Sequence, residues 1–243
     1  MDTMDLGSLL RSNPYPGRGI ILGRSEDGGH AVLLYFIMGR SENSRNRIFV
    51  KTDDGIKTQA YDPKKMTDPS LVIYHPVRRL MLPDGIRHIV TNGDQTDTIR
   101  DYLNDGNNFM DALLTREFEP DAPNYTPRIS GLLFPDGLYM LSILKTQNSD
   151  PGCCLRHFFT YSFPLPGVGH FIHTYSSDGD PLPSFEGEPT PISIAVENGL
   201  ENFARIVWDS MNDDNKVSLY ASEIEIASGT SREIIINKRE GIV

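Results

Sequence analysis

The segment Gly39–Arg47, GRSENSRNR, gathers three arginines, two serines and two asparagines between two apolar runs, where a hairpin connection is expected. Guanidinium groups bind phosphate or carboxylate oxygens two at a time, and hydroxyl and amide groups add neutral hydrogen bonds. The segment therefore predicts a local anchor for a phosphate or carboxylate group. A solvated loop with surface ion pairs is the alternative.

A second polar segment, Val90–Arg100 (VTNGDQTDTIR), joins the end of a predicted strand to a predicted helix. Thr96 or Asp97 is expected to cap that helix, whose free N–H groups carry a partial positive charge. The side chains before the helix would then lie at the edge of a sheet and face a site there. A well-capped helix start without a ligand is the alternative.

Two more segments contain groups that can move a proton. Tyr74 and His75 stand at the end of the run LVIY, close to Arg78, and an arginine can tune the pKa of a neighbouring acid. The proline-rich stretch Glu117–Arg128 (EFEPDAPNYTPR) contains three carboxylates. The alternative for Tyr74 is an aromatic side chain half-buried in a strand. The alternative for Glu117–Arg128 is a surface connection.

The elements that must position these residues are mostly strands. Four turns that contain Asp-Gly lie between apolar runs, which favours antiparallel hairpins over a parallel α/β fold. The predicted strands are 18–24, 31–38, 47–51, 56–61, 79–82, 86–91, 129–134, 138–146, 155–163, 168–175, 217–227 and 233–237. Helices are predicted over 96–103, 108–115 and 195–211, the last with an apolar stripe that contains Trp208.

This order predicts an α+β fold in which two antiparallel sheets pack together and helices lie outside. We expect one domain over residues 1–243, because no repeat or convincing linker interrupts the chain. The Pro- and acid-rich segment 178–191 is a candidate lid over a site.

Composition excludes several classes of protein. The net charge of -10 and the pI of about 5.0 argue against nucleic-acid partners and against anionic membranes. The ratio of basic to acidic residues is highest near the start of the chain, where residues 1–60 carry 8 Lys or Arg and 7 Asp or Glu. Cys153 and Cys154 are adjacent, so we expect free thiols, and the lack of a secretory signal adds to the expectation of a cytoplasmic protein.

No metal or cofactor motif is present in the sequence. The six histidines are scattered, and His170 and His173 have opposite parity on a predicted strand, which argues against a shared metal. We therefore expect neither a metal nor a cofactor. A homo-oligomer is compatible with the sequence.

Taken together and in this order, GRSENSRNR, YHPVR, VTNGDQTDTI and NYTPRI resemble the archaeal-type IMP cyclohydrolase family, most clearly over about residues 17–130. The resemblance implies a four-layer αββα sandwich like that of the N-terminal-nucleophile hydrolases. It also implies that the purine ribonucleotide FAICAR closes its second ring, loses water and becomes IMP, without metal or cofactor.

The resemblance also implies roles for individual residues. The catalytic arginine, tyrosine and glutamate of the family fall on Arg47, Tyr74 and Glu119. The residues expected to bind the substrate are Arg40, Ser44, Asn46, Arg78, Asn92, Asp94, Thr96 and Arg128.

Two other functions stay open. One is an amide hydrolase with a processed N-terminal nucleophile, for which Thr3 is the nearest candidate. The other is a protein that binds a purine nucleotide without turning it over.

Overall fold

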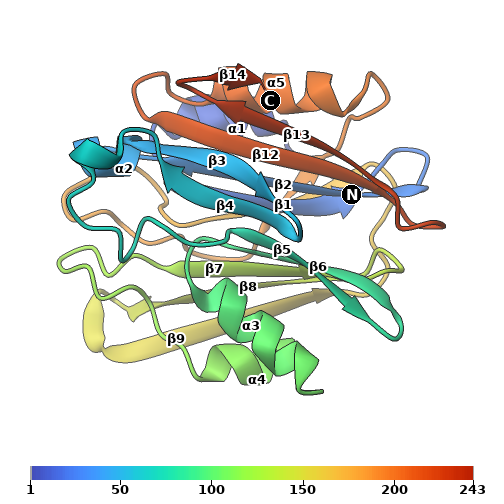
Figure 1. The fold of residues 1–243 in the computed structure, drawn as a ribbon, viewed down its shortest axis with the longest axis horizontal. Coiled ribbons are helices and arrows are strands. Elements are labelled where there is room, and N and C mark those ends of the chain that lie inside the picture. The colour runs from blue at the N-terminus through green and yellow to red at the C-terminus, as the bar shows by residue number, and fades with distance from the viewer. Residues whose placement is uncertain (1, 243) are drawn as a thin grey trace.

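Two antiparallel sheets of seven strands each make up most of the chain in the computed structural model, which describes residues 2–242 (Figure 1). Sheet A has the order β11-β10-β1-β2-β12-β13-β14, and sheet B runs in sequence order from β3 to β9. The α+β class with two antiparallel sheets is therefore confirmed.

Sheet A is built from both ends of the chain. Its strands are β1 (Arg18–Arg24), β2 (His30–Met38), β10 (Val168–His173), β11 (Thr190–Ser193), β12 (Lys216–Glu225), β13 (Ser231–Asn237) and β14 (Gly241–Ile242). The sheet B strands are β3 (Arg47–Thr52), β4 (Gly55–Ala60), β5 (Val77–Leu82), β6 (Gly85–Thr91), β7 (Arg128–Leu133), β8 (Tyr139–Gln147) and β9 (Asp150–Tyr161).

The four Asp-Gly turns each join neighbouring antiparallel strands, as predicted. Gly28 and Gly137 adopt φ angles of 69° and 84°, which side chains other than glycine rarely accept. Each turn therefore fixes the register of the hairpin around it.

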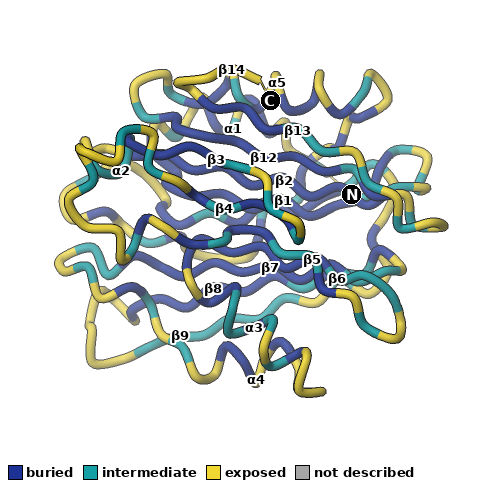
Figure 2. The backbone as a smooth tube through the Cα atoms, in the orientation of Figure 1, coloured by how far each residue is buried: buried dark blue, intermediate teal, exposed yellow. Residues whose placement is uncertain are grey.

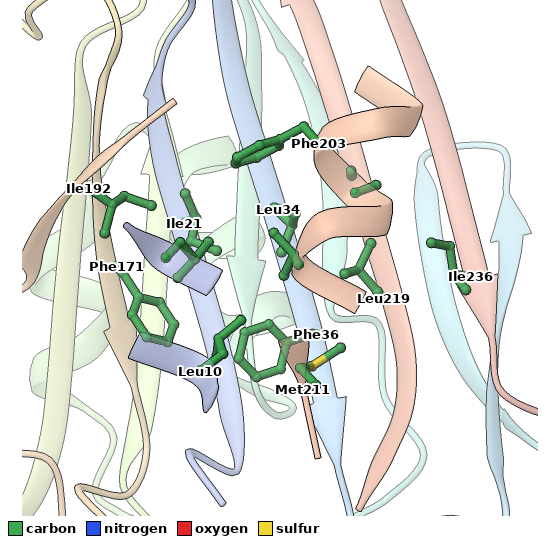
Figure 3. Packing of buried hydrophobic residues seen from close by; sticks show 14 of the residues in the cluster. Leu10, Ile21, Leu34, Phe36, Phe171, Ile192, Phe203, Met211, Leu219 and Ile236 are labelled. Carbon is green, nitrogen blue, oxygen red and sulfur yellow. The ribbon is translucent and has the colours of Figure 1, made fainter. Parts of the chain in front are cut away.

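Helices cover the outer face of each sheet, and apolar side chains fill three layers. The helices are α1 (Leu6–Ser12), α2 (Glu42–Arg45), α3 (Gln95–Asn104), α4 (Phe109–Leu114) and α5 (Leu200–Ser210), with a short 3-10 turn over Pro63–Lys65. Phe203 of α5 and Leu10 of α1 pack on the sheet A residues Leu34, Phe36 and Phe171 (Figure 3). Helices α3 and α4 cover sheet B through a separate cluster that contains Ile99, Leu113 and Leu132.

The layer between the sheets is mainly apolar, with tyrosine hydroxyls and a few buried polar side chains among the apolar groups. Ile20, Leu33 and Tyr35 of sheet A pack there on Phe49 and Ile129 of sheet B. The strands are accordingly buried along their length, whereas exposure concentrates in the turns and at the edge (Figure 2). Polar residues at the ends of the central strands are the exception, and they form the candidate site.

Several predicted elements differ from the structure. The last helix begins at Leu200 rather than Ala195, because a turn closed by the hydrogen bond from Gly199 N to Val196 O precedes it and Gly199 adopts a non-helical φ angle of 92°. Asp94, not Thr96 or Asp97, is the N-cap of α3, and the Thr96 hydroxyl donates instead to the carbonyl of Gly93.

The connection Gly39–Arg47 is not the hairpin that we expected between two apolar runs. It leads from β2 in sheet A to β3 in sheet B and contains the single turn of α2. The run LVIY is also not a strand but a turn, so Tyr74 lies in the connection before β5. Helices α1 and α2 and strands β11 and β14 were not predicted.

One smaller expectation, which concerns the two cysteines, is met. Cys153 and Cys154 are free thiols. None of the helices within residues 2–242 is long and apolar enough to cross a membrane.

Candidate active site

A cleft of about 210 Å³ opens at the end of the sandwich where β1 begins. Arg18 is the first residue of β1, in the interior of sheet A, and the segment between β2 and β3 forms one wall. The lining residues are Tyr15, Arg18, Arg40, Ser41, Ser44, Asp121, Asn124, Thr126, Tyr175 and Leu182.

Arg47, the first residue of β3, is the most deeply buried cation near the cleft. Its side chain is 1% exposed, and its Nε donates to the carbonyl oxygen of Ser44 at 2.7 Å. Neither Nη1 nor Nη2 has a hydrogen-bond partner among the described residues. Burial lowers the pKa of Arg47, and the positive charge of Arg18 lowers it further. A buried guanidinium without acceptors is costly, so these two nitrogens are suited to bind oxygen atoms of a ligand.

Arg18 connects the cleft to the buried groups behind it. It lines the cleft, is 8% exposed, and has an Nε without a partner within residues 2–242. Burial disfavours its charge, but the neighbouring Glu119 carboxylate raises the pKa of Arg18 well above the ordinary value. Arg18 therefore stays charged and places a fixed positive charge beside Glu119.

Glu119 is a buried carboxyl in the irregular segment before β7. It is 1% exposed, and its Oε1 accepts no hydrogen bond within the described chain. Burial raises the pKa of Glu119 to about 7, against the opposing charges of Arg18 and Arg128. A carboxyl group with this pKa exchanges its proton at neutral pH, as a general base or acid must.

Gly93 brings Glu119 and Arg128 close to the start of α3. A Cβ atom on Gly93 would lie 2.4 Å from Arg128 Nη1 and 3.3 Å from Glu119 Oε1. Any side chain at this position would displace the Arg128 guanidinium. The Asn92-Gly93 turn is therefore required for the close approach of backbone and charged groups.

Tyr74 is held firmly although it lies outside the strands. Its backbone N–H donates to Thr58 Oγ1 at 2.8 Å, and its carbonyl accepts from the Thr58 N–H at 2.9 Å. Its hydroxyl lies 2.8 Å from the hydroxyl of Tyr35, which projects from β2 between the sheets. Tyr74 is also close enough to Arg47 for an electrostatic effect on the pKa of that guanidinium. The pair of phenols is suited to pass a proton.

Arg40 and Ser44 lie at the mouth of the cleft. Arg40 Nη1 is 2.8 Å from Asp178 Oδ1 and donates to the Gly179 carbonyl at 2.7 Å, so it ties the acidic segment 178–191 to the cleft. The Arg40 guanidinium also lies 5.2 Å from the centre of the Tyr15 ring. Ser44 forms a capping box with Ser41 at the start of α2.

Three of the residues expected to bind substrate have their polar atoms occupied within the protein. Asn46 exchanges hydrogen bonds with the backbone of Asp62. Asn92 donates to Pro127 O and accepts from the Ile129 N–H, both at 2.9 Å. Thr96 Oγ1 lies 2.5 Å from Thr91 Oγ1. In the structure these side chains hold the walls of the site in place.

The remaining three predicted residues divide between two places. Arg128 Nη1 donates to Gln95 Oε1 at 2.6 Å and lies 2.8 Å from Asp94 Oδ1, so both residues stand beside Glu119. Arg78 forms ion pairs with Asp54 and Asp97 instead. The structure does not bring Arg78 together with Tyr74 and Arg47.

Sequence reasoning missed several polar residues of the site. They are Tyr15, Arg18, Tyr35, Thr126 and Tyr175. Arg18 carried a detectable signal, because a charged residue opens a strand that is otherwise apolar. The tyrosines gave no such signal, since a buried tyrosine is common in a core.

Two further expectations concern a metal ion and a processed N-terminal nucleophile. No group of three or more His, Cys, Asp or Glu side chains suited to a metal ion occurs within residues 2–242. Thr3, the nearest candidate for a processed nucleophile, lies at β11 with its hydroxyl 2.7 Å from Ser193 Oγ, and it does not line the cleft.

Comparison with known proteins gives one consistent result. The family model described as IMP cyclohydrolase-like protein matches residues 15–228. The chain is 34% identical over 130 residues to the IMP cyclohydrolase of Methanococcus maripaludis strain C6, covering 52% of this chain and 61% of that protein. It is 29% identical over 195 residues to the IMP cyclohydrolase of Methanopyrus kandleri, covering 71% of this chain and 89% of that protein. The match to the first of these relatives thus spans less than two thirds of its length.

Proposed function

Because the chain belongs to the IMP cyclohydrolase-like family, we propose that it is a hydrolase of purine biosynthesis that closes the ring of FAICAR to give IMP and water. The substrate is a purine ribonucleotide with one phosphate, and the product keeps that phosphate. The curated relatives with this name support the proposal through the similarity reported above.

We further propose that the layers of helix, sheet, sheet and helix correspond to the fold of the N-terminal-nucleophile hydrolases and form one domain over residues 1–243. The support is that helices lie on the outer faces of both sheets and that the candidate site takes Arg18 from sheet A and Arg47 and Arg128 from sheet B. In this arrangement Arg18 stands at the start of an interior strand of sheet A, close to Glu119.

The cleft supplies groups for the phosphate and for the base. Arg40, Ser41 and Ser44 line its mouth, where the Arg40 guanidinium and the Ser41 hydroxyl can donate to phosphate oxygens. The Ser44 hydroxyl donates to the Ser41 carbonyl at 2.9 Å and would have to exchange this bond for one to the ligand. Arg40 would exchange its bond with Asp178 for bonds with the ligand. The reacting carbons would then lie deeper, toward Arg47 and Glu119.

Binding itself removes much of the barrier, because the carboxamide and formyl groups are already in one molecule and need only the right geometry. The carboxamide nitrogen attacks the formyl carbon, a C–N bond forms, and one proton leaves that nitrogen. Ionised Glu119, with a pKa raised by burial to about 7, accepts this proton.

The formyl oxygen gains negative charge as the ring closes. The two unpartnered Nη atoms of Arg47 are suited to stabilise it, in the manner of an oxyanion hole. Tyr74 donates a proton to this oxygen, and its bond to Tyr35 supports the phenolate that remains. Protonated Glu119 then returns its proton to this hydroxyl, which leaves as water as its C–O bond breaks. The former formamido nitrogen gives its proton to the Tyr74 phenolate, which yields the aromatic ring and restores both side chains.

One observation carries this proposal. Arg47 and Glu119 are each 1% exposed, yet Arg47 Nη1, Arg47 Nη2 and Glu119 Oε1 have no partner among residues 2–242. Structural residues of this kind normally have all their polar atoms satisfied. A buried cation and a buried carboxyl with free atoms beside one cleft are typical of a site that binds and reacts.

The test is direct conversion of FAICAR to IMP by the purified chain, followed by absorbance and chromatography, with a chelator present. We expect turnover that is lost in Arg47→Met and kept in Arg45→Met, a neighbouring arginine whose guanidinium already bonds to Gly39 and Asn215. Binding of IMP without any conversion of FAICAR would instead identify a nucleotide-binding protein. Absence of both would refute the proposal.

A further inference from the structure

A second cavity, of about 320 Å³, borders the proposed active site, and Arg47 of the proposed mechanism is one of its lining residues. We call it the basic pocket and define it by its lining residues Arg45, Arg47, Asp214, Lys216, Val217, Lys238 and Arg239. It shares no lining residue with the cleft. The start of β3, the start of β12 and the chain after β13 form its walls.

The charge of the basic pocket is opposite to that of the chain. Five of its seven lining residues are lysine or arginine and one is aspartate, although the chain as a whole carries a net charge of -10. Like charges gathered in one cavity repel each other and reduce stability unless something compensates. A bound anion would supply this compensation.

Neighbouring carboxylates compensate little of this charge. Lys216 Nζ lies 2.6 Å from Asp213 Oδ1, and this is the one ion pair formed by the five cations within the described residues. Arg45 donates to neutral oxygens of Gly39 and Asn215. Lys238 donates to the backbone carbonyl of Asp213.

The other two cations have still fewer partners. Arg239 lies 5.0 Å from the centre of the Tyr61 ring and makes no ion pair in the described part of the chain. Arg47, 1% exposed, has two Nη atoms without any partner there. The pocket thus holds a buried guanidinium with free donors in addition to its exposed lysine and arginine.

We propose that the basic pocket is a second anion site, which binds the oligophosphate group of a small molecule such as a nucleoside di- or triphosphate. A single phosphate carries at most two negative charges, whereas five cations against Asp214 of the lining and Asp213, which pairs with Lys216, leave an excess of three positive charges. A chain of two or three phosphates matches that excess. Guanidinium forks and lysine ammonium groups are the side chains that proteins use for such groups.

The position of the only tryptophan provides a reporter for binding. Lys216 Nζ lies 4.9 Å from the centre of the Trp208 ring and donates to the Trp208 carbonyl at 3.2 Å. An anion that draws Lys216 toward the pocket changes the charge above this ring. We therefore expect the fluorescence of Trp208 to change in a saturable way as the pocket fills.

The experiment titrates the full chain with inorganic triphosphate at low ionic strength, followed by calorimetry and by Trp208 fluorescence. We expect one triphosphate to bind per chain, more weakly as salt is added. The double variant Lys238→Glu/Arg239→Glu should weaken binding at least tenfold. Both side chains are exposed, so the variant should fold, which circular dichroism and a urea midpoint will verify.

Two controls distinguish binding in the basic pocket from a general effect of net charge and from binding in the cleft. Lys51→Glu/Arg232→Glu makes the same change in net charge at exposed positions outside the pocket and should leave the affinity unchanged. Arg40→Ala alters the cleft and should also leave triphosphate binding unchanged. A parallel titration with a nucleoside triphosphate shows whether a base adds to the affinity of the phosphates.

Three results would overturn the proposal. They are no saturable binding, an equal loss of affinity in the control double variant, and a loss that follows Arg40 rather than Lys238 and Arg239. None of these results depends on whether the chain converts FAICAR, so failure here is distinct from failure of the proposed function.

Discussion

Replacement of Glu119 by glutamine separates the proton chemistry of this carboxyl from its role in packing. Glutamine has nearly the same shape and preserves hydrogen-bonding capacity, but it cannot accept a proton as a base. Glu119 is 1% exposed and lies beside Arg18 and Arg128, so the substitution changes charge and little else. We expect the variant to fold and to lose turnover.

The size of the effect follows from the pKa of about 7 that burial gives Glu119. With that pKa about one tenth of the carboxyl is ionised at pH 6 and about nine tenths at pH 8, so kcat/KM should rise about tenfold across this range. General bases contribute roughly 100- to 10,000-fold to rate, and Glu119→Gln should lose an amount in that range together with the pH dependence.

The same pKa predicts a change in stability that needs no substrate. In the folded chain Glu119 holds its proton up to about pH 7, whereas in an unfolded chain it releases the proton near pH 4.5. The folded state therefore binds more protons between these values, and the free energy of unfolding falls as pH rises, by about 3 kcal/mol over the interval. Glu119→Gln should remove this slope.

Steady-state kinetics and urea unfolding between pH 5 and 8.5 measure both effects in the same samples. Glu117→Gln is the matched control, because Glu117 is exposed two residues away and should keep both profiles unchanged. A rise in kcat/KM that persists in Glu119→Gln would assign the titration to another group. A wild-type stability that does not fall over this interval would refute the buried carboxyl with a raised pKa.

Three further changes test other parts of the site. Tyr74→Phe should lower kcat by about 100-fold or more. Tyr35→Phe removes only the hydrogen-bond partner of Tyr74 and should lower kcat less. An effect of Tyr74→Phe on KM alone would contradict the proton-transfer role. Arg18→Met removes a positive charge that lowers the pKa of Glu119, so the midpoint of the pH–rate profile should move above about 7, and an unchanged midpoint would count against the contact. Asp178→Asn frees Arg40 from an exposed ion pair, so KM should fall about two- to fivefold. If KM were unchanged in both Asp178→Asn and Arg40→Ala, Arg40 would not bind the substrate phosphate.

The strand framework was predictable because its signals are local. Apolar runs bounded by Asp-Gly turns gave the four hairpins β1–β2, β3–β4, β5–β6 and β7–β8. The pairing of β2 with β12 was not predictable, since it joins residues nearly two hundred positions apart. Alternation along a strand says which face is buried but does not name the neighbouring strand.

The missed elements are short or depend on tertiary contacts. Helix α2 is a single turn of polar residues held by a capping box between Ser41 and Ser44, without any apolar stripe. Strand β11 contains Pro191 and is recognisable only from its pairing with β10. Helix α5 was predicted too long because the apolar stripe extends back before Gly199 into a non-helical segment, where Val196 joins the same core.

The residues of the candidate site fall into two groups: those whose buried polar atoms have hydrogen-bond partners within the chain and those whose polar atoms do not. Residue type alone does not reveal to which group a residue belongs. Asn92 and Arg47 look equally functional in the sequence, and both are almost fully buried. The structure gives Asn92 partners at Pro127 and Ile129, whereas Arg47 keeps two donors free. Since the cost of an unmet buried charge must be repaid by a ligand or by function, the free donors of Arg47 are stronger evidence for a reactive site than the composition of its segment. By the same reasoning, if Arg47→Met raised stability and left the conversion of FAICAR intact, the free guanidinium would have no catalytic role and the site would have to lie elsewhere.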